Sequence, residues 1–220
     1  MVKRALVERR PWLFASLLVA LAWLFLSGDP AIPGIYKFVW KGVPVALLAV
    51  YAFQRHLGRD GMLLTAVLVL AAIADMFSEL QFAAAGTVMS FSLLAAIWLY
   101  WSNRRENIVG SQKALALVLA IAVPVVSWLL LAGEEGRALA TGFSLLMAIM
   151  AALAWTSRFS RYRVGVGAVL FVVSELLLFA TQGPILRDNS IAAWLVWPVY
   201  YAGQLMIATG VVSRLRRERA

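Results

Sequence analysis

Residues 62–80 read MLLTAVLVLAAIADMFSEL, and this stretch decides the class of fold. It is apolar except for one threonine, one serine and two acids, and its length matches the roughly 20 apolar residues that one membrane-spanning helix needs. The whole chain has the same character, with 63% hydrophobic and 14% charged residues among 220. An ordinary soluble domain is about half apolar and about a quarter charged. We therefore exclude a soluble globular protein and expect a polytopic membrane protein.

Seven further apolar runs, bounded by charged or turn-forming residues, accompany this stretch. The eight runs are Trp12–Ser27, Phe38–Phe53, Met62–Leu80, Phe82–Trp101, Ala114–Ala132, Ala138–Thr156, Val164–Ala180 and Ala192–Val212. They predict an all-α bundle of eight transmembrane helices, with a tight hairpin around Glu79 to Phe82. Helices are expected because open strands would leave backbone groups unpaired in hydrocarbon. No long linker interrupts the chain, so residues 1–220 are predicted to form a single integral-membrane domain.

The basic residues predict how the bundle is oriented. If the N-terminus is cytoplasmic, sixteen of the twenty lysines and arginines fall on the cytoplasmic side, including Lys3, Arg4, Arg9 and Arg10. The four on the outer side are Lys37, Lys41, Arg137 and Arg187. This asymmetry favours cytoplasmic N and C termini and a location in the bacterial inner (plasma) membrane. The basic clusters are thus interpreted as topology anchors, and no nucleic-acid partner is expected.

The first run could alternatively be a secretory signal, because four basic residues precede it. No small-x-small cleavage site follows the run, so a retained helix is expected.

Three ionisable residues, Lys41, Asp75 and Glu175, fall inside predicted spans, and Glu79 lies at the end of one. A charged side chain at the centre of a spanning helix costs about 2.5–3.5 kcal/mol on insertion scales. The cost falls if such groups face one another or a wet cavity, and carboxyls there can stay protonated. The predicted topology places all of these residues in the outer half of the membrane, which predicts a shared polar pocket at that depth.

The last predicted helix adds three polar side chains to this set. Tyr200 and Gln204 are four residues apart and share a helix face, with Tyr201 beside them. Asp75 and Glu79 have the same spacing and are expected to share a face as well. All of these side chains fall in the outer or middle part of their spans.

Each of these residues also has a purely structural interpretation. Asp75 and Glu175 could form an ion pair with Lys41 or neutral hydrogen bonds that hold the bundle together, and Glu79 could be solvated at the interface. Tyr200, Tyr201, Trp194 and Trp197 could belong to the interfacial aromatic belt. Pro44 and Pro198 could simply kink their helices, or could free the carbonyls of Trp40 and Trp194 as acceptors near the pocket.

Several catalytic chemistries are excluded by composition. The chain has no cysteine and one histidine, His56, so it has no thiolate nucleophile and cannot build a histidine-rich zinc site. His56 falls in a predicted cytoplasmic loop, on the opposite side from both buried acids, which excludes a serine, histidine and acid triad. Carboxylate chemistry remains, with a possible contribution from a lysine and tyrosines.

Four segments carry a resemblance to a known family. They are Lys41-Gly-Val-Pro44, Ala71-Ala-Ile-Ala-Asp75 followed by Gly86, Gly167-Ala-Val-Leu-Phe-Val-Val-Ser174-Glu175, and Tyr200-Tyr-Ala-Gly-Gln204. Their order and spacing over residues 37–210 resemble the YhhN-like lysoplasmalogenase family. The chain departs from the family pattern at Ala74, where a glycine is usual, at Glu175, where an aspartate is usual, and at Ser92, where many members have histidine.

The resemblance implies hydrolysis of the vinyl (alkenyl) ether bond of a lysoplasmalogen to a fatty aldehyde and a glycerophospho-base. It implies Asp75 and Glu175 as the catalytic acid and base, in unassigned order, and no metal or organic cofactor. The implied substrate-binding residues are Lys41, Glu79, Tyr200, Tyr201 and Gln204. The expected partners are a lysophospholipid substrate and the membrane lipids. The headgroup, the chain length and the oligomeric state stay open.

Two other classes of function fit the same residues. A proton-coupled transporter or lipid exporter would use the buried acids to relay protons. A membrane scaffold without catalysis would use them only for helix packing.

Overall fold

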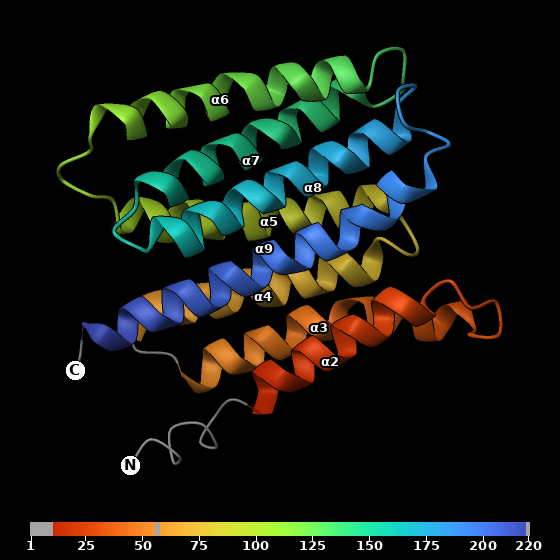
Figure 1. Ribbon diagram of the computed structural model, residues 1–220, viewed down its shortest axis with the longest axis horizontal. Coiled ribbons are helices and arrows are strands. Elements are labelled where there is room, and N and C mark those ends of the chain that lie inside the picture. Colours follow the sequence, from red (N-terminus) through yellow and green to blue (C-terminus); the bar gives the residue numbers. More distant parts are fainter. Residues whose placement is uncertain (1–10, 56–57, 219–220) are drawn as a thin grey trace. The chain divides into compact units, whose positions relative to one another are not determined.

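The computed structural model describes residues 11–55 and 58–218, and every regular element in these residues is a helix (Figure 1). The elements are α2 (Pro11–Leu26), α3 (Gly34–Gln54), α4 (Gly58–Phe77), α5 (Phe82–Ser102), α6 (Gly110–Leu130), α7 (Arg137–Thr156), the π-helical turn η1 (Arg161–Gly165), α8 (Val166–Gln182) and α9 (Ser190–Arg217). The predicted all-α class is confirmed for this part of the chain. His56 and the basic residues Lys3, Arg4, Arg9, Arg10 and Arg219 lie outside it.

Seven of the helical segments are long and apolar enough to cross a membrane. They are α3 to α7, the continuous segment Arg161–Gln182 formed by η1 and α8, and α9, and each overlaps one predicted run. The remaining run forms α2, whose 16 residues extend only about 24 Å, whereas the hydrocarbon core is about 30 Å thick. The chain is thus an integral membrane protein with seven candidate spans and a shorter apolar helix in the described residues. The eighth span and the cytoplasmic termini stay predictions.

The chain divides into two compact units, Met1–Ala96 with Val211–Ala220, and Ile97–Gly210. We call them unit 1 and unit 2. In unit 1, α2 packs against α3 through one narrow face. Ser16, Ala20 and Trp23 are buried along this face, and the Ser16 Oγ donates a hydrogen bond to the Pro44 carbonyl oxygen over 2.7 Å. The helix continues through Pro44.

The backbones of α3 and α4 come into close contact at Gly42. A Cβ atom at this position would lie 2.6 Å from Cγ of Met76 and would also overlap the backbone oxygen of Ala72. Because no larger residue fits there, the contact fixes the antiparallel register of the two helices. The edge-to-face contact of Phe38 with Phe77, with ring centroids 6.2 Å apart, agrees with this register.

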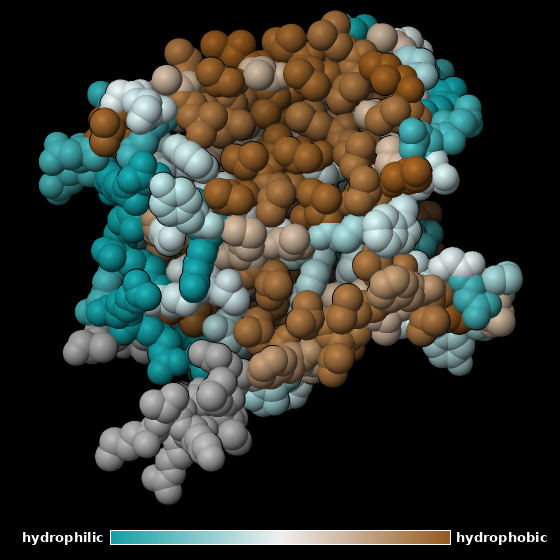
Figure 2. All heavy atoms as spheres, viewed as in Figure 1, coloured by the Kyte–Doolittle hydropathy of each residue, from teal (hydrophilic) through white to brown (hydrophobic). Residues whose placement is uncertain are grey.

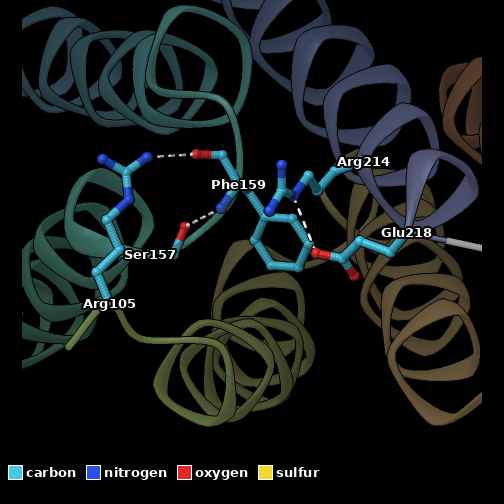
Figure 3. A network of polar contacts seen from close by, with 5 residues as sticks. All are labelled: Arg105, Ser157, Phe159, Arg214 and Glu218. Carbon is cyan, nitrogen blue, oxygen red and sulfur yellow. Dashed lines mark hydrogen bonds and ion pairs between the residues drawn. The ribbon is translucent and has the colours of Figure 1, made fainter.

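In unit 2, the connectors after α5 and after α7 meet at one end of the helices. They form an isolated antiparallel bridge between Arg104 and Ser157, and the Arg105 guanidinium donates to the Phe159 carbonyl oxygen over 3.1 Å (Figure 3). Figure 3 also shows, in unit 1, the ion pair of Arg214 with Glu218 near the end of α9.

The two other connectors of unit 2 meet in the same way. Arg187, between α8 and α9, forms an ion pair with Glu134, between α6 and α7. Alternate connectors therefore gather at opposite ends of the unit, which is the up-and-down order that the charge pattern predicted for α6 to α9.

The side of unit 2 formed by α6 and α7 is strongly apolar. Figure 2 shows this surface in brown, and its exposed residues on α6 include Leu117, Val118, Ile121, Val125 and Leu129. Only 11% of the most apolar 18-residue stretch of α6 is buried. So large an exposed apolar surface suits contact with lipid chains rather than with water.

The contact at Gly42 yields a stability prediction. Replacing Gly42 with alanine should lower the free energy of unfolding by about 1–3 kcal/mol, because the backbone of α4 must shift to admit the methyl group. Gly142→Ala is the matched control, since it lies inside α7 and its Cβ would meet nothing within 4 Å. The control should raise stability by up to about 1 kcal/mol. Thermal unfolding in detergent micelles measures both changes, and equal effects of the two variants would contradict the packing argument.

Candidate functional site

Lys41 and Glu79 form an ion pair at one end of α3 and α4. The Lys41 Nζ donates to the Glu79 Oε1 over 2.7 Å, and their side chains are 22% and 31% exposed. Lys41 lies two turns into α3, and Glu79 lies in the turn that follows α4. The contact at Gly42, next to Lys41, holds the backbones close enough for the side chains to meet. The structure thus joins two of the side chains that the sequence placed at the same depth.

The four-residue spacing predicted that Glu79 shares a helix face with Asp75, and this prediction is wrong. The helix ends at Phe77, and the Glu79 N–H donates to the carbonyl oxygen of Met76 in a tighter turn. Ser78 contributes to this ending, because its Oγ donates over 2.7 Å to the carbonyl oxygen of Asp75 and competes with the helical hydrogen bonds. Glu79 is also not simply solvated at the interface, since Lys41 binds its carboxylate.

Asp75 is the buried acid of unit 1. It lies in the last turn of α4 and is 7% exposed. Gly42 of α3 contacts α4 at this depth. Helix α5 is linked to α4 by a hydrogen bond of 2.8 Å from the Ser92 Oγ to the Val67 carbonyl oxygen. Because the two helices are antiparallel, this bond places Ala84 of α5 level with Asp75. Small residues, Gly42 on α3 and Ala84 on α5, therefore lie at the depth of Asp75 on the two helices next to α4 in the chain.

In unit 2, α8 and α9 come into close contact through two glycines. A Cβ atom at Gly167 would lie 2.8 Å from the Gly203 oxygen, and one at Gly203 would lie 2.7 Å from the Gly167 oxygen. About one turn further along, the rings of Phe171 and Tyr200 pack with their centroids 5.8 Å apart. These contacts fix the register of the two helices that carry Glu175 and the other candidate residues of unit 2.

This register spreads the candidate residues of unit 2 over two helical turns rather than one depth. Glu175 lies four residues after Phe171, and Gln204 lies four residues after Tyr200. Because the helices are antiparallel, these steps lead in opposite directions. At 1.5 Å per residue, Glu175 and Gln204 are separated by about 12 Å along the helices. The sequence placed Glu175 in the outer half of its span and Gln204 in the outer or middle part of its span, and this separation does not contradict those positions, so their depth in a membrane stays a prediction.

Gln204 is a buried side chain with an unmet acceptor. It is 4% exposed, and no group in the described residues donates a hydrogen bond to its Oε1. Buried polar atoms nearly always have a partner, and the remaining cases need an explanation. A donor on a bound ligand or an ordered water would satisfy this oxygen.

Tyr201 is positioned by Trp197, one turn earlier on α9. Their rings are stacked, with centroids 5.4 Å apart and planes 6° from parallel. The sequence assigned Trp197 to the interfacial belt and missed this role. The four-residue spacing of the two aromatic residues was the signal that could have revealed it.

The candidate residues fall into two groups. Lys41, Asp75 and Glu79 belong to unit 1, and Glu175, Tyr200, Tyr201 and Gln204 belong to unit 2. Joint catalysis by Asp75 and Glu175, one from each unit, stays a prediction. Within residues 11–55 and 58–218, no three histidine, aspartate or glutamate side chains are grouped as metal ligands.

Comparison with known proteins gives one match. The model of the YhhN family matches residues 36–211, a range that includes every candidate residue named above. No curated protein and no solved structure matches the chain.

The ion pair between Lys41 and Glu79 should be measurable in a double-mutant cycle. Lys41→Met and Glu79→Gln should each lower the free energy of unfolding, and the coupling between them should be about 1 kcal/mol, because both charges are only partly exposed. The cycle of Arg214→Met and Glu218→Gln is the control, since this pair is four residues apart in the chain and its Arg214 side chain is 45% exposed, so it should give about 0.3–0.5 kcal/mol. Additive effects of the Lys41 and Glu79 variants would contradict the pairing.

Proposed function

Because the chain belongs to the YhhN family, we propose that it is a membrane hydrolase that cleaves the vinyl ether bond of a lysoplasmalogen. The products are a fatty aldehyde and a glycerophospho-base, and the protein acts in the bacterial inner membrane. One observation carries the proposal: Asp75, in the segment that resembles the family motif, is an almost fully buried carboxyl group in a helix apolar enough to span a membrane. Such a residue is a functional candidate by default, because its burial is costly.

The reaction needs only proton transfers and water. A carboxylic acid protonates the vinyl carbon remote from oxygen, which leaves an oxocarbenium ion. Water adds to the cationic carbon while a carboxylate accepts a proton from it, and the resulting hemiacetal collapses to the aldehyde and the free glycerol hydroxyl. The proton gained by the carboxylate replaces the one given by the acid, so the pair is ready for another cycle.

Asp75 and Glu175 are the proposed acid and base. Two carboxyl groups in an environment poor in water can hold different protonation states, as the acid pairs of glycosidases do. Glu175 supports the assignment because it is partly buried on α8, which together with η1 is apolar and long enough to span a membrane, one turn beyond the Phe171 and Tyr200 contact.

The remaining candidate residues bind the substrate in this proposal. Lys41 meets the lipid phosphate, and Glu79 holds the Lys41 ammonium in place until the phosphate arrives. Gln204 accepts a hydrogen bond from the substrate or from the attacking water through its unpartnered Oε1. Tyr200 and Tyr201, held by Phe171 and Trp197, complete the polar lining.

Amide replacement tests the two acids. Asp75→Asn and Glu175→Gln should each lower aldehyde release from a lysoplasmalogen in detergent micelles by at least about a hundredfold, since an amide neither donates the catalytic proton nor accepts one from water. Asp60→Asn is the matched control, because Asp60 is an acid in the first turn of the same helix as Asp75 and should be dispensable. Thermal unfolding verifies that the variants are folded. Full activity in both acid variants would refute the mechanism.

A second experiment separates hydrolysis from transport. The proposal predicts aldehyde release by the purified protein without any ion gradient. A proton-coupled transporter or lipid exporter would instead give flux in vesicles that depends on a pH gradient and would form no product.

A further inference from the structure

An apolar groove of about 340 Å³ runs along the pair α3 and α4 in unit 1. Its volume lies in the range of known ligand sites, roughly 300–1,000 Å³. The lining residues are Ala46, Ala49, Val50 and Phe53 of α3, and Thr65, Val69, Ala72, Ile73 and Met76 of α4. The groove exists because small residues, three alanines and a threonine, alternate with larger ones along the two helices.

The lining offers no polar group to an occupant. Thr65 is its one residue with a polar side chain, and the Thr65 hydroxyl already donates to the Gly61 carbonyl oxygen over 2.9 Å. A ligand that fills this groove therefore gains only from apolar contact, so the occupant is a hydrocarbon chain.

The groove has one polar end and one apolar end. Gly42 contacts α4 at Met76, so Met76 and Ala46 mark the end next to the ion pair of Lys41 and Glu79. From Met76 to Thr65, at the opposite end, the lining covers eleven steps of α4, or about 16 Å. This is roughly half of the ~30 Å hydrocarbon core, the depth that one lipid chain occupies in one leaflet.

The charges at the polar end match a phospholipid headgroup. The ammonium of Lys41 complements a lipid phosphate, and the carboxylate of Glu79 complements the amine of a zwitterionic headgroup. A chain lying in the groove places its first carbons near Met76, the residue next to Asp75. In a lysoplasmalogen the vinyl ether joins the glycerol to these first carbons, so the groove brings the scissile bond to the depth of the buried acid.

We propose that the groove between α3 and α4 holds the hydrocarbon chain of the lysolipid substrate and sets its chain-length preference. The inference rests on the function proposed above for the substrate's identity. In this proposal the residues around Phe53 and Thr65, which lie far from Asp75, select among substrates of different chain length.

Two neighbouring residues of α4 provide the test. Thr65→Phe places a ring at the far end of the groove, whereas Ala66→Phe adds the same ring at an exposed position outside it. Thr65→Phe should lower aldehyde release from a long-chain lysoplasmalogen about tenfold relative to a short-chain one, because only the long chain reaches Thr65. Ala66→Phe should leave this ratio unchanged.

If Thr65→Phe fails to fold, Phe53→Ala keeps the inference testable. Phe53 is 49% exposed, so its truncation should be tolerated, and the opened far end should shift the preference toward longer chains. Phe91→Ala, at a 58% exposed position of α5 outside the groove, is the control and should not shift it.

A binding experiment gives a readout that is independent of hydrolysis. A long-chain lysophosphatidylethanolamine with a diazirine at its chain end, photolysed with the protein in micelles, should label the segments around Phe53 and Thr65, as mass spectrometry would show. Labelling elsewhere, or crosslinks only between two copies of the chain, would overturn the inference.

The two proposals fail in different ways. Labelling of the groove without aldehyde release from any lysoplasmalogen would support the groove and refute hydrolysis. Aldehyde release whose chain-length ratio ignores both Thr65→Phe and Phe53→Ala would support hydrolysis and overturn the role of the groove.

Discussion

Helices surrounded by lipid gain little from hydrophobic association, so their packing depends on places where backbones can touch. In this protein glycine supplies those places, at Gly42 between α3 and α4 and at Gly167 and Gly203 between α8 and α9. Each contact sets the register of an antiparallel pair. The first brings Lys41 within hydrogen-bond distance of Glu79, and the second places the rings of α8 and α9 against each other. The positions of the functional side chains within each unit are consequences of these contacts.

The polar side chains of the helices divide into two kinds. Hydroxyl groups such as those of Thr65 and Thr209 donate to carbonyl oxygens of their own helix, so they are satisfied without help from a ligand. The amide oxygen of Gln204, by contrast, is buried and finds no donor in the described residues. Its burial asks for a donor that helix formation does not supply, which is why Gln204 points to a site.

The sequence predicts the helices far better than it predicts the site. Apolar runs locate all seven long segments, because backbone hydrogen bonds must be closed in hydrocarbon and length follows from thickness. The sequence prediction fails at Glu79, where a regular helix was assumed past Phe77, because the Ser78 hydroxyl competes with the helical hydrogen bonds at the end of α4. The sequence also does not give the register between helices, because periodicity locates a residue only on its own helix, whereas register depends on which residues are small enough to touch.

A single-chain phospholipid needs a charged environment for its headgroup and an apolar one for its chain, with the reactive group where the two meet. The pair α3 and α4 has the ion pair of Lys41 and Glu79 at one end, and the buried acid Asp75 and the outer end of the apolar groove at Met76 follow at nearly the same depth. This depth follows from the position of Asp75 in the last turn of its helix. An acid nearer the middle of α4 would face methylene groups, which have no bond to protonate, and one beyond Phe77 would lie in the polar turn with Glu79. The depth of the carboxyl group in the membrane is thus a determinant of which bond it can reach.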